Sequence, residues 1–477
     1  MNIIILGAGR VGESVAESLV SEQNDITVVD TDPVRLRALE ERLDLRGVVG
    51  NAIQPSVLKL AGANDADMLI ACAAADETNL VVCKVAHDVF NVPNTIARLR
   101  SPEFVEGDPL LGPLGFGVNH VICPEESVMR YVHKLIEYPE ALQVMDFADG
   151  RVSLVAVRAT AGGLLVGHTV HEIKDLFPLA DMRVVALYRQ DTEVRDLKAN
   201  RILAGDEVFV LAATEHIRDV LTAIHRKDRP VERLMIAGGG KVGLRLARSM
   251  VGKCQVKLLE QDPKRCEYLA SQLPSDTLVL QGDGADEGLL EEENVGDMDL
   301  FISLTSDDED NIMAGNLAKR LGCKRVVALI NRRAYAEMIE GGPIDIGISP
   351  AQVSIGTLLA HVRQGDVAEV HSLRRGAAEA LEIVAHGDAK SSKVIGKRID
   401  QIDWPHGVTV AALVRHFDKS VVIGQTDDWT AITRHGEVII AHHDTVIEAD
   451  DHVIVFCTRK KLVKKVEKLF QVGFHFF

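Results

Sequence analysis

The segment Ile3-Ile4-Ile5-Leu6-Gly7-Ala8-Gly9-Arg10-Val11-Gly12 lies at the start of the chain and predicts its fold class. An apolar run of this kind predicts a buried strand, and glycines spaced G-x-G-x-x-G predict a tight turn into a helix. The first glycine lets the strand turn, the second lets backbone N–H groups approach a phosphate, and the third lets the helix pack closely on the strand. The segment therefore predicts the first βα unit of a nucleotide-binding fold.

The same pattern occurs a second time. The run Leu234-Met235-Ile236-Ala237 leads into Gly238-Gly239-Gly240-Lys241-Val242-Gly243. In both copies a second apolar run ends in an acid, Asp30 or Glu260, 23 residues after Gly7 and 22 after Gly238. A carboxylate there accepts hydrogen bonds from a ribose diol and disfavours a 2′-phosphate, so the pattern favours NAD(H) over NADP. The alternative is a pair of glycine turns that hold no ligand.

The duplication continues beyond the glycines and predicts the domain organisation. Each copy contains five strand-like runs alternating with helical patterns, which indicates an α/β domain with a parallel, doubly wound, Rossmann-like sheet. Each is followed by an apolar helix and a small, β-rich α+β domain, and a charged linker, 225–230, separates the halves. The predicted limits are 1–123 and 231–349 for the Rossmann-like domains, 124–139 and 350–365 for the helices, 140–226 and 366–457 for the small domains, and 458–477 for a basic helix and tail.

Composition narrows the function classes. The chain has 477 residues and a formal charge of −17, which argues against binding nucleic acid. No apolar run reaches the roughly 18 residues of a membrane span, and Met1-Asn2 leads straight into the first strand without a signal peptide, so we expect a cytoplasmic protein. Seven cysteines without a CxxC pair predict buried thiols rather than disulfides.

Acidic and histidine-rich segments do not predict a metal site. Asp76-Glu77 and Asp307-Asp308-Glu309-Asp310 stand where helices begin, so we interpret them as solvated first turns that complement the helix dipole. His442-His443-Asp444 falls in a turn without a partner Cys or a suitably spaced His.

At this point the residues resemble a known family. Segments such as Asp25-Ile26-Thr27-Val28-Val29-Asp30, Ile136-Glu137-Tyr138-Pro139 and Ser372-Leu373-Arg374-Arg375-Gly376 are similar to those of the TrkA family, the peripheral subunits of bacterial Trk potassium-uptake systems. The resemblance covers essentially the whole chain. It implies two RCK-type nucleotide domains, each followed by a TrkA-C-type domain.

The resemblance also implies a function. Members are regulatory subunits without a chemical step, they respond to NAD(H) and to ATP or ADP, and they pass a change in packing to an integral membrane potassium channel or transporter. A homo-oligomer, a dimer or a tetramer of this chain, would act on the cytoplasmic face of the inner membrane. The helices that follow the Rossmann-like domains would cross over to pair two units; packing within one domain is the alternative.

Two arginines follow the fifth strand of the first copy. Alternation places Arg98 and Arg100 on one face, and in the family an arginine here can reach a nucleotide phosphate. The alternative is a pair of surface arginines that offset the acidic charge. The second copy has Ile330-Asn331-Arg332-Arg333, with adjacent arginines that would point apart. We therefore predict ATP or ADP at the first site and NAD(H) at the second.

Asn51-Ala52 and Asp283-Gly284 follow the third strand of each copy, where adenine or ribose edges lie in such folds; turn chemistry explains them equally well. The predicted nucleotide-binding residues are Gly7, Ala8, Gly9, Arg10, Val11, Gly12, Asp30, Asn51, Ala52, Arg98 and Arg100 in the first copy, and Gly238, Gly240, Lys241, Val242, Gly243, Glu260, Asp283 and Gly284 in the second.

Two other functions are weighed against this one. An NAD-dependent oxidoreductase needs an acid or base beside the nicotinamide, and none of the five tyrosines is followed four residues later by lysine. A structural scaffold without nucleotide leaves both acids and both second glycine turns unexplained. Near the C-terminus, the lysines between 460 and 468 alternate with apolar residues as a basic amphipathic helix. We expect it to dock on its own domain, with contact to lipid headgroups as the alternative.

Overall fold

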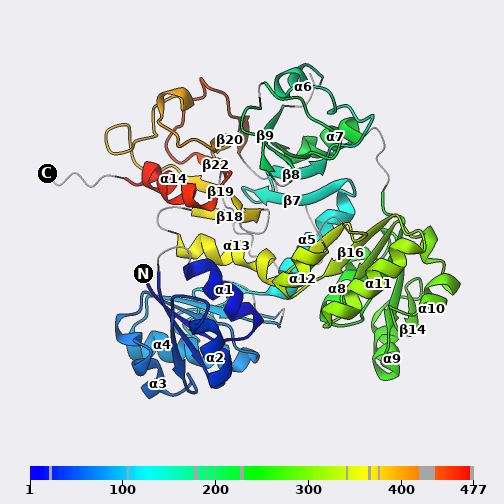
Figure 1. Ribbon diagram of the computed structural model, residues 1–477. Coiled ribbons are helices and arrows are strands. Elements are labelled where there is room, and N and C mark those ends of the chain that lie inside the picture. The colour runs from blue at the N-terminus through cyan, green and yellow to red at the C-terminus, as the bar shows by residue number, and fades with distance from the viewer. Residues whose placement is uncertain are drawn as a thin grey trace. The chain divides into compact units, whose positions relative to one another are not determined.

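Figure 1 shows the computed structural model of the chain. It describes residues 1–20, 24–101, 103–104, 107–176, 181–190, 192–197, 199–225, 230–339, 342–363, 367–373, 377–417 and 436–472. Most of the predicted linker (226–229), part of the Ser372–Gly376 segment (374–376) and the end of the tail (473–477) lie outside the described residues.

The first half begins with a parallel sheet in the strand order β3-β2-β1-β4-β5-β6. Its strands are β1 (Asn2–Leu6), β2 (Asp25–Asp30), β3 (Arg46–Val49), β4 (Met68–Ala71), β5 (Asn94–Arg98) and β6 (His120–Ile122). Its helices are α1 (Arg10–Val20), α2 (Pro33–Glu40), α3 (Pro55–Leu60), α4 (Asp76–Phe90) and α5 (Pro124–Glu137). The predicted doubly wound sheet is confirmed, but a sixth strand was missed because β6 is too short to show a hydrophobic period.

The second half repeats this sheet in the order β14-β13-β12-β15-β16-β17. Its strands are β12 (Arg233–Ala237), β13 (Gln255–Glu260), β14 (Leu278–Gln281), β15 (Leu300–Ser303), β16 (Arg325–Leu329) and β17 (Ile346–Ile348). Its helices are α8 (Lys241–Met250), α9 (Pro263–Gln272), α10 (Glu287–Glu292), α11 (Asp308–Arg320), α12 (Arg333–Met338) and α13 (Pro350–Val362). The register also repeats: Leu6 lies beside Val29 and Ala71, and Ala237 lies beside Leu259 and Ser303.

The small domains contain antiparallel sheets in the orders β10-β9-β11-β8-β7 and β18-β19-β22-β20-β21. The first comprises β7 (Ala141–Phe147), β8 (Val152–Arg158), α6 (Val170–Leu176), β9 (Met182–Arg189), β10 (Thr192–Glu193), β11 (Glu207–Ala213) and α7 (Thr214–His225). The second comprises β18 (Val367–Leu373), β19 (Ala378–Val384), β20 (Val408–Arg415), β21 (Glu437–Ile440), β22 (His452–Cys457) and α14 (Val463–Phe470).

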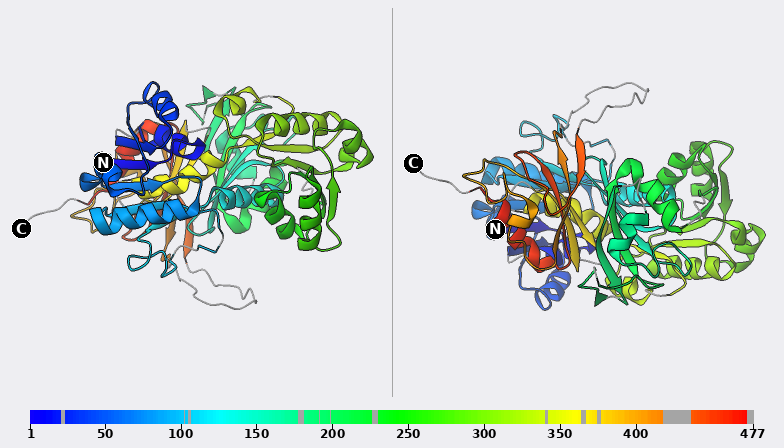
Figure 2. Two further views of the ribbon diagram at one scale, coloured as in Figure 1. Left: turned by 90° about the horizontal axis from the view of Figure 1, so that it is seen from below. Right: turned by 90° about the horizontal axis from the view of Figure 1, so that it is seen from above.

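The chain folds into two compact units that each combine both halves of the sequence. The first unit, residues 1–130 and 232–358, contains both Rossmann-like sheets, and the second, residues 131–231 and 359–477, contains both small domains. Within the second unit the two antiparallel sheets lie side by side (Figure 2). They share one hydrophobic core that includes Phe147, Phe209 and Phe456. Equivalent domains therefore pack together although they are far apart in sequence, while the exact domain limits stay predictions.

The cysteines are only partly as expected. All seven are free thiols, but Cys123, Cys254 and Cys266 are half-buried rather than buried. Burial raises the pKa of Cys72 to about 12, which keeps this thiol protonated.

Candidate nucleotide-binding site

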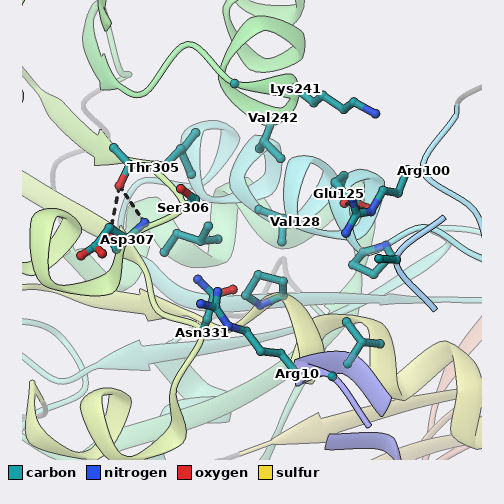
Figure 3. A pocket seen from close by; sticks show the side chains of 18 of the residues that line it. Arg10, Arg100, Glu125, Val128, Lys241, Val242, Thr305, Ser306, Asp307 and Asn331 are labelled. Atoms are coloured by element: carbon teal, nitrogen blue, oxygen red, sulfur yellow. Dashed lines mark hydrogen bonds and ion pairs between the residues drawn. The ribbon is translucent and has the colours of Figure 1, made fainter. Parts of the chain in front are cut away.

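A cavity of about 1070 Å³ lies within the first unit, and both glycine loops line it. Figure 3 shows that Arg10 and Glu125 from the first half and Val242 and Asn331 from the second surround the same space. Of the residues predicted to bind nucleotide, all line this cavity except Ala8, Gly12 and Gly243, which are buried. The two predicted sites are therefore parts of one continuous cavity.

The turn that leaves each first strand requires its first glycine. Gly7 has φ +97° and Gly238 has φ +110°, a region that L side chains rarely adopt. The N–H of Gly7 donates to the Val29 carbonyl at 2.8 Å, and that of Gly238 donates to the Leu259 carbonyl at 2.9 Å. Each loop is thereby tied to the neighbouring strand.

The acids at the ends of β2 and β13 organise the loops. Asp30 Oδ2 accepts from the Ala8 N–H at 2.6 Å, and Glu260 Oε2 accepts from the Gly239 N–H at 2.9 Å. Their other oxygens accept from the N–H groups of Asp32 and Asp262. Because a carboxylate oxygen has two lone pairs, both acids keep acceptor capacity for a ribose diol.

The second glycines leave space where a phosphate would lie. A Cβ built on Gly9 or Gly240 has no neighbouring atom within 4 Å. The open side of each loop adjoins the start of α1 or α8, where unpaired backbone N–H groups and the helix dipole favour an anion.

The polar residues after the third strands form turns at the rim of the cavity. Asn51 Oδ1 accepts from the Ile53 N–H at 3.1 Å, and Asp283 Oδ1 accepts from the Ala285 N–H at 2.8 Å. Both side chains are exposed and line the cavity. Each side chain therefore forms a turn and also lines the cavity, so both interpretations of these residues stay open.

Arg98 and Arg100 both face the cavity from the end of β5. Arg98 is 9% exposed, and its guanidinium lies 3.3 Å from Glu125 Oε1. Arg100 Nε lies 3.5 Å from the same oxygen. The Nε of Arg98 is buried without a hydrogen-bond partner in the described part of the chain. Two cations that share one carboxylate leave a net positive charge for a ligand.

Two buried asparagines, which sequence reasoning did not identify as site residues, define how the halves correspond. Asn79 Nδ2 donates to the carbonyls of Ala73 and Arg98. Asn311 Nδ2 makes the same bonds to the carbonyls of Thr305 and Leu329. The identical clamp makes Leu329 the counterpart of Arg98, and by chain order it makes Asn331 the counterpart of Arg100. The sequence signal that could have identified these two residues is an asparagine three positions after Asp76 and after Asp308.

The sequence comparison that set Arg332 and Arg333 against Arg98 and Arg100 is therefore wrong, because these residues do not occupy equivalent positions. Arg332 corresponds to Ser101, and its guanidinium is paired with Glu309 at 2.8 Å and stacked on Tyr335. The side chain of Arg333 lies outside the described residues. In the second half no arginine among the described lining residues faces the cavity.

The acidic residues at the helix starts were predicted to be solvated, and this prediction is wrong for the carboxylates that begin α4 and α11. Asp308 is 3% exposed and accepts from the N–H groups of Asn331 at 2.9 Å and Arg332 at 2.8 Å. Asp76 accepts from the N–H groups of Arg100 and Ser101, both at 3.0 Å. These carboxylates hold the loop after the fifth strand, a long-range role that helix-start chemistry does not reveal.

The cavity residues that the two halves contribute, called the first and the second end below, differ in net charge. The described first-half lining has four cations and two carboxylates, Arg10, Arg35, Arg98, Arg100, Asp30 and Glu125. The second-half lining has one cation and four carboxylates, Lys241, Glu260, Asp283, Asp307 and Asp310. Burial and the nearby carboxylates of Asp307, Asp283 and Glu309 raise the pKa of Asp310. The lining residues of the first half therefore offer more positive charge to phosphates than those of the second.

Among the described helices, none has both the length and the apolar character needed to cross a membrane. The described side chains also include no group of three or more His, Cys, Asp or Glu residues arranged to hold a metal ion.

Comparisons with known proteins agree with this architecture. The family model of the TrkA-N domain matches residues 3–124 and 234–350. The chain is 49% identical to the Trk system potassium uptake protein TrkA of Vibrio alginolyticus, with 99% of each chain covered. It is 47% identical to the protein of the same name from Halomonas elongata over the full length of both.

Among solved structures, the GsuK RCK domain matches with a TM-score of 0.59 at 16% identity, covering 98% of this chain and 94% of that one. A structure described as the GsuK channel bound to NAD matches with the same TM-score and identity, covering 98% of this chain and 78% of that one. At this level of identity the likeness concerns the fold alone.

Proposed function

This chain belongs to the family of Trk system potassium uptake proteins TrkA, and from that premise we propose that it is a two-input nucleotide sensor. Its relatives are named as potassium uptake proteins and not as enzymes. The proposed inputs are ATP or ADP at the first glycine loop and NAD(H) at the second. The residues proposed to bind them are those predicted from the sequence that line the cavity.

The difference in net charge between the lining residues of the two halves supports this proposal. Arg98 and Arg100 stand where the second half has Leu329 and Asn331, so the first half contributes two extra cations for a polyphosphate. Charge-assisted hydrogen bonds from arginine to phosphate are about twice as strong as neutral ones. The second half contributes Glu260, which can accept from a ribose diol, but only one cation, Lys241, that could hold a γ-phosphate. This combination suits a dinucleotide.

A sensor of this kind acts through a partner. We propose that a homo-oligomer, a dimer or tetramer of this chain, binds an integral membrane potassium channel or transporter at the cytoplasmic face and biases its gate. Such coupling requires that each nucleotide prefer one packing of the first unit over another. A cavity lined by both halves supports this, because a ligand there contacts both Rossmann-like domains at once.

Calorimetric titration of the purified chain with ATP, ADP, NAD and NADH tests the proposal, with Gly9→Trp and Gly240→Trp as variants. Because a Cβ at either position meets no atom within 4 Å, we expect a tryptophan side chain there to extend into the proposed phosphate site. We expect Gly9→Trp to abolish ATP and ADP binding and Gly240→Trp to abolish NAD(H) binding. If none of the nucleotides binds to the unmodified chain, the scaffold interpretation replaces the sensor. If one variant removes both classes, the sites are not independent.

The charge of Asp310 should limit anion binding at the second end. Burial and three nearby carboxylates raise its pKa, so it takes up a proton at a higher pH than an ordinary aspartate. We expect NAD to bind more tightly as the pH falls from neutral toward this raised pKa, because a neutral Asp310 repels the pyrophosphate less. Asp310→Asn should bind NAD several-fold more tightly at neutral pH and lose most of this pH dependence. Titration of NAD over a pH series measures both; unchanged affinity and slope in the variant would count against the assignment.

A further inference from the structure

The second small domain carries a concentrated basic surface at its C-terminal end. Between residues 459 and 468 the chain has six cations and one acid, namely Arg459, Lys460, Lys461, Lys464, Lys465, Lys468 and Glu467, in a protein of net charge −17. In the first small domain α7 follows β11 as α14 follows β22, yet its described part has Glu215 and Asp219 against Arg218. Within the described residues, therefore, the helix that follows the last strand of the small domain is strongly basic in the second half and not in the first.

The apolar side of α14 is already occupied. Val463 and Val466 are fully buried, Phe470 is 6% exposed, and the helix lies beside β19 (Figure 1). Docking on its own domain, the expected arrangement, is thus confirmed. This helix has no apolar face left to insert into a bilayer or a groove.

A buried ion pair fixes the orientation of the helix. Glu467, the one acid of the segment, is turned inward and lies 3.6 Å from Arg363, which also contacts Glu379 at 2.6 Å. All three side chains are at most 8% exposed. The inward acid leaves only cations on the outer side, where Lys461, Lys465 and Lys468 are exposed.

A neighbouring loop extends the same surface. Lys393 Nζ donates to the Lys468 carbonyl at 3.4 Å, and Lys397 Nζ donates to the Lys393 carbonyl at 2.8 Å. These bonds go to neutral oxygens and so leave both charges uncompensated. We define the basic face as Lys393, Lys397, Lys461, Lys465 and Lys468, all of which are exposed.

We propose that the basic face binds the anionic phospholipid surface of a membrane. Lysine ammonium groups are point charges on flexible stems, which suits a diffuse array of phosphates, whereas the planar fork of arginine is better matched to a fixed carboxylate. Anionic bilayers attract each such lysine by a similar increment. Because the apolar side of α14 faces inward, adsorption is purely electrostatic and depends on salt over a Debye length of about 8 Å at physiological ionic strength.

Vesicle cosedimentation of the full chain, without nucleotide and without any membrane protein, tests this proposal. Vesicles of phosphatidylcholine with added phosphatidylglycerol are compared with pure phosphatidylcholine at low and high salt. The test variant is Lys461→Gln/Lys465→Gln/Lys468→Gln. A matched control, Arg37→Gln/Lys59→Gln/Lys264→Gln, removes three exposed cations from the first unit and makes the same change in net charge.

We expect binding only to the anionic vesicles, loss of that binding at high salt, and a partition coefficient about a hundredfold lower for the test variant, with little change for the control. Equal thermal unfolding of all three proteins shows that the substitutions leave the fold intact. Equal binding to neutral vesicles, an unaffected test variant, or an equally weakened control overturns the proposal. So does a result in which pure lipid binds none of the proteins but native membranes bind the basic face, since its partner is then an acidic protein.

Discussion

Gly12→Ala is expected to lower the free energy of unfolding of the first Rossmann-like domain by about 3 kcal/mol, whereas Gly9→Ala changes it by less than about 1 kcal/mol. A Cβ on Gly12 would lie 1.8 Å from the Gly7 carbonyl oxygen, a backbone atom. That oxygen cannot retreat easily, because Gly7 has φ +97° and its N–H is bonded to Val29. The clash is relieved only if α1 moves away from β1.

Thermal unfolding and hydrogen exchange of the full chain measure this difference. We expect Gly12→Ala to increase exchange in β1 and α1 and to leave β12 and α8 protected. The second half offers the matched pair, since a Cβ on Gly243 would lie 2.0 Å from the Gly238 oxygen while one on Gly240 meets nothing within 4 Å. Unaltered stability of Gly12→Ala would show that the helix adjusts freely, against the close packing described above.

Exchanging the cavity residues between the halves should exchange their nucleotide preference. We expect Arg98→Leu/Arg100→Asn, which installs the residues of the second half, to weaken ATP binding by about a hundredfold or more, because hydrogen bonds to charged groups are worth roughly 1.5–3 kcal/mol each. NAD binding at the second glycine loop should change little. The reciprocal variant, Leu329→Arg/Asn331→Arg, should gain ATP affinity at the second end.

Calorimetry with each nucleotide measures the exchange, and one control is essential. Removal of both arginines leaves Glu125 without its cations, and an unpaired carboxylate would itself repel phosphate. Glu125→Gln alone should therefore keep or increase ATP affinity, and adding it to the double variant should restore only a small part of the loss. If the double variant binds ATP like the unmodified chain, the arginines are surface charges, and the nucleotide assignment of the first end fails.

Much of the architecture could be predicted because it depends on local patterns. The glycine spacings after Leu6 and Ala237, and the acids Asp30 and Glu260, follow from what one strand, one turn and one helix require. The parallel sheets and the antiparallel small domains follow from the alternation of such segments. Three-residue strands such as β6 lie below the length at which periodicity is visible.

The misjudged residues depend on distant partners. Asp308 is chemically suited to a solvated helix start, and only the loop after β16, 23 residues away, makes it a buried acceptor. The correspondence of Arg100 with Asn331 rather than with Arg332 likewise follows from the hydrogen bonds of Asn79 and Asn311.

The chain's own pattern is thus sufficient for two nucleotide-type βαβ units, their order and their small domains, because each is encoded by residues within a few tens of positions. The pairing of like domains into two units and the arrangement of both loops around one cavity arise only when the halves pack together. Those features arise from side chains more than two hundred residues apart, such as Arg10 and Lys241, which line one cavity because buried surfaces of the two halves pack together. The sequence near either residue does not indicate this arrangement.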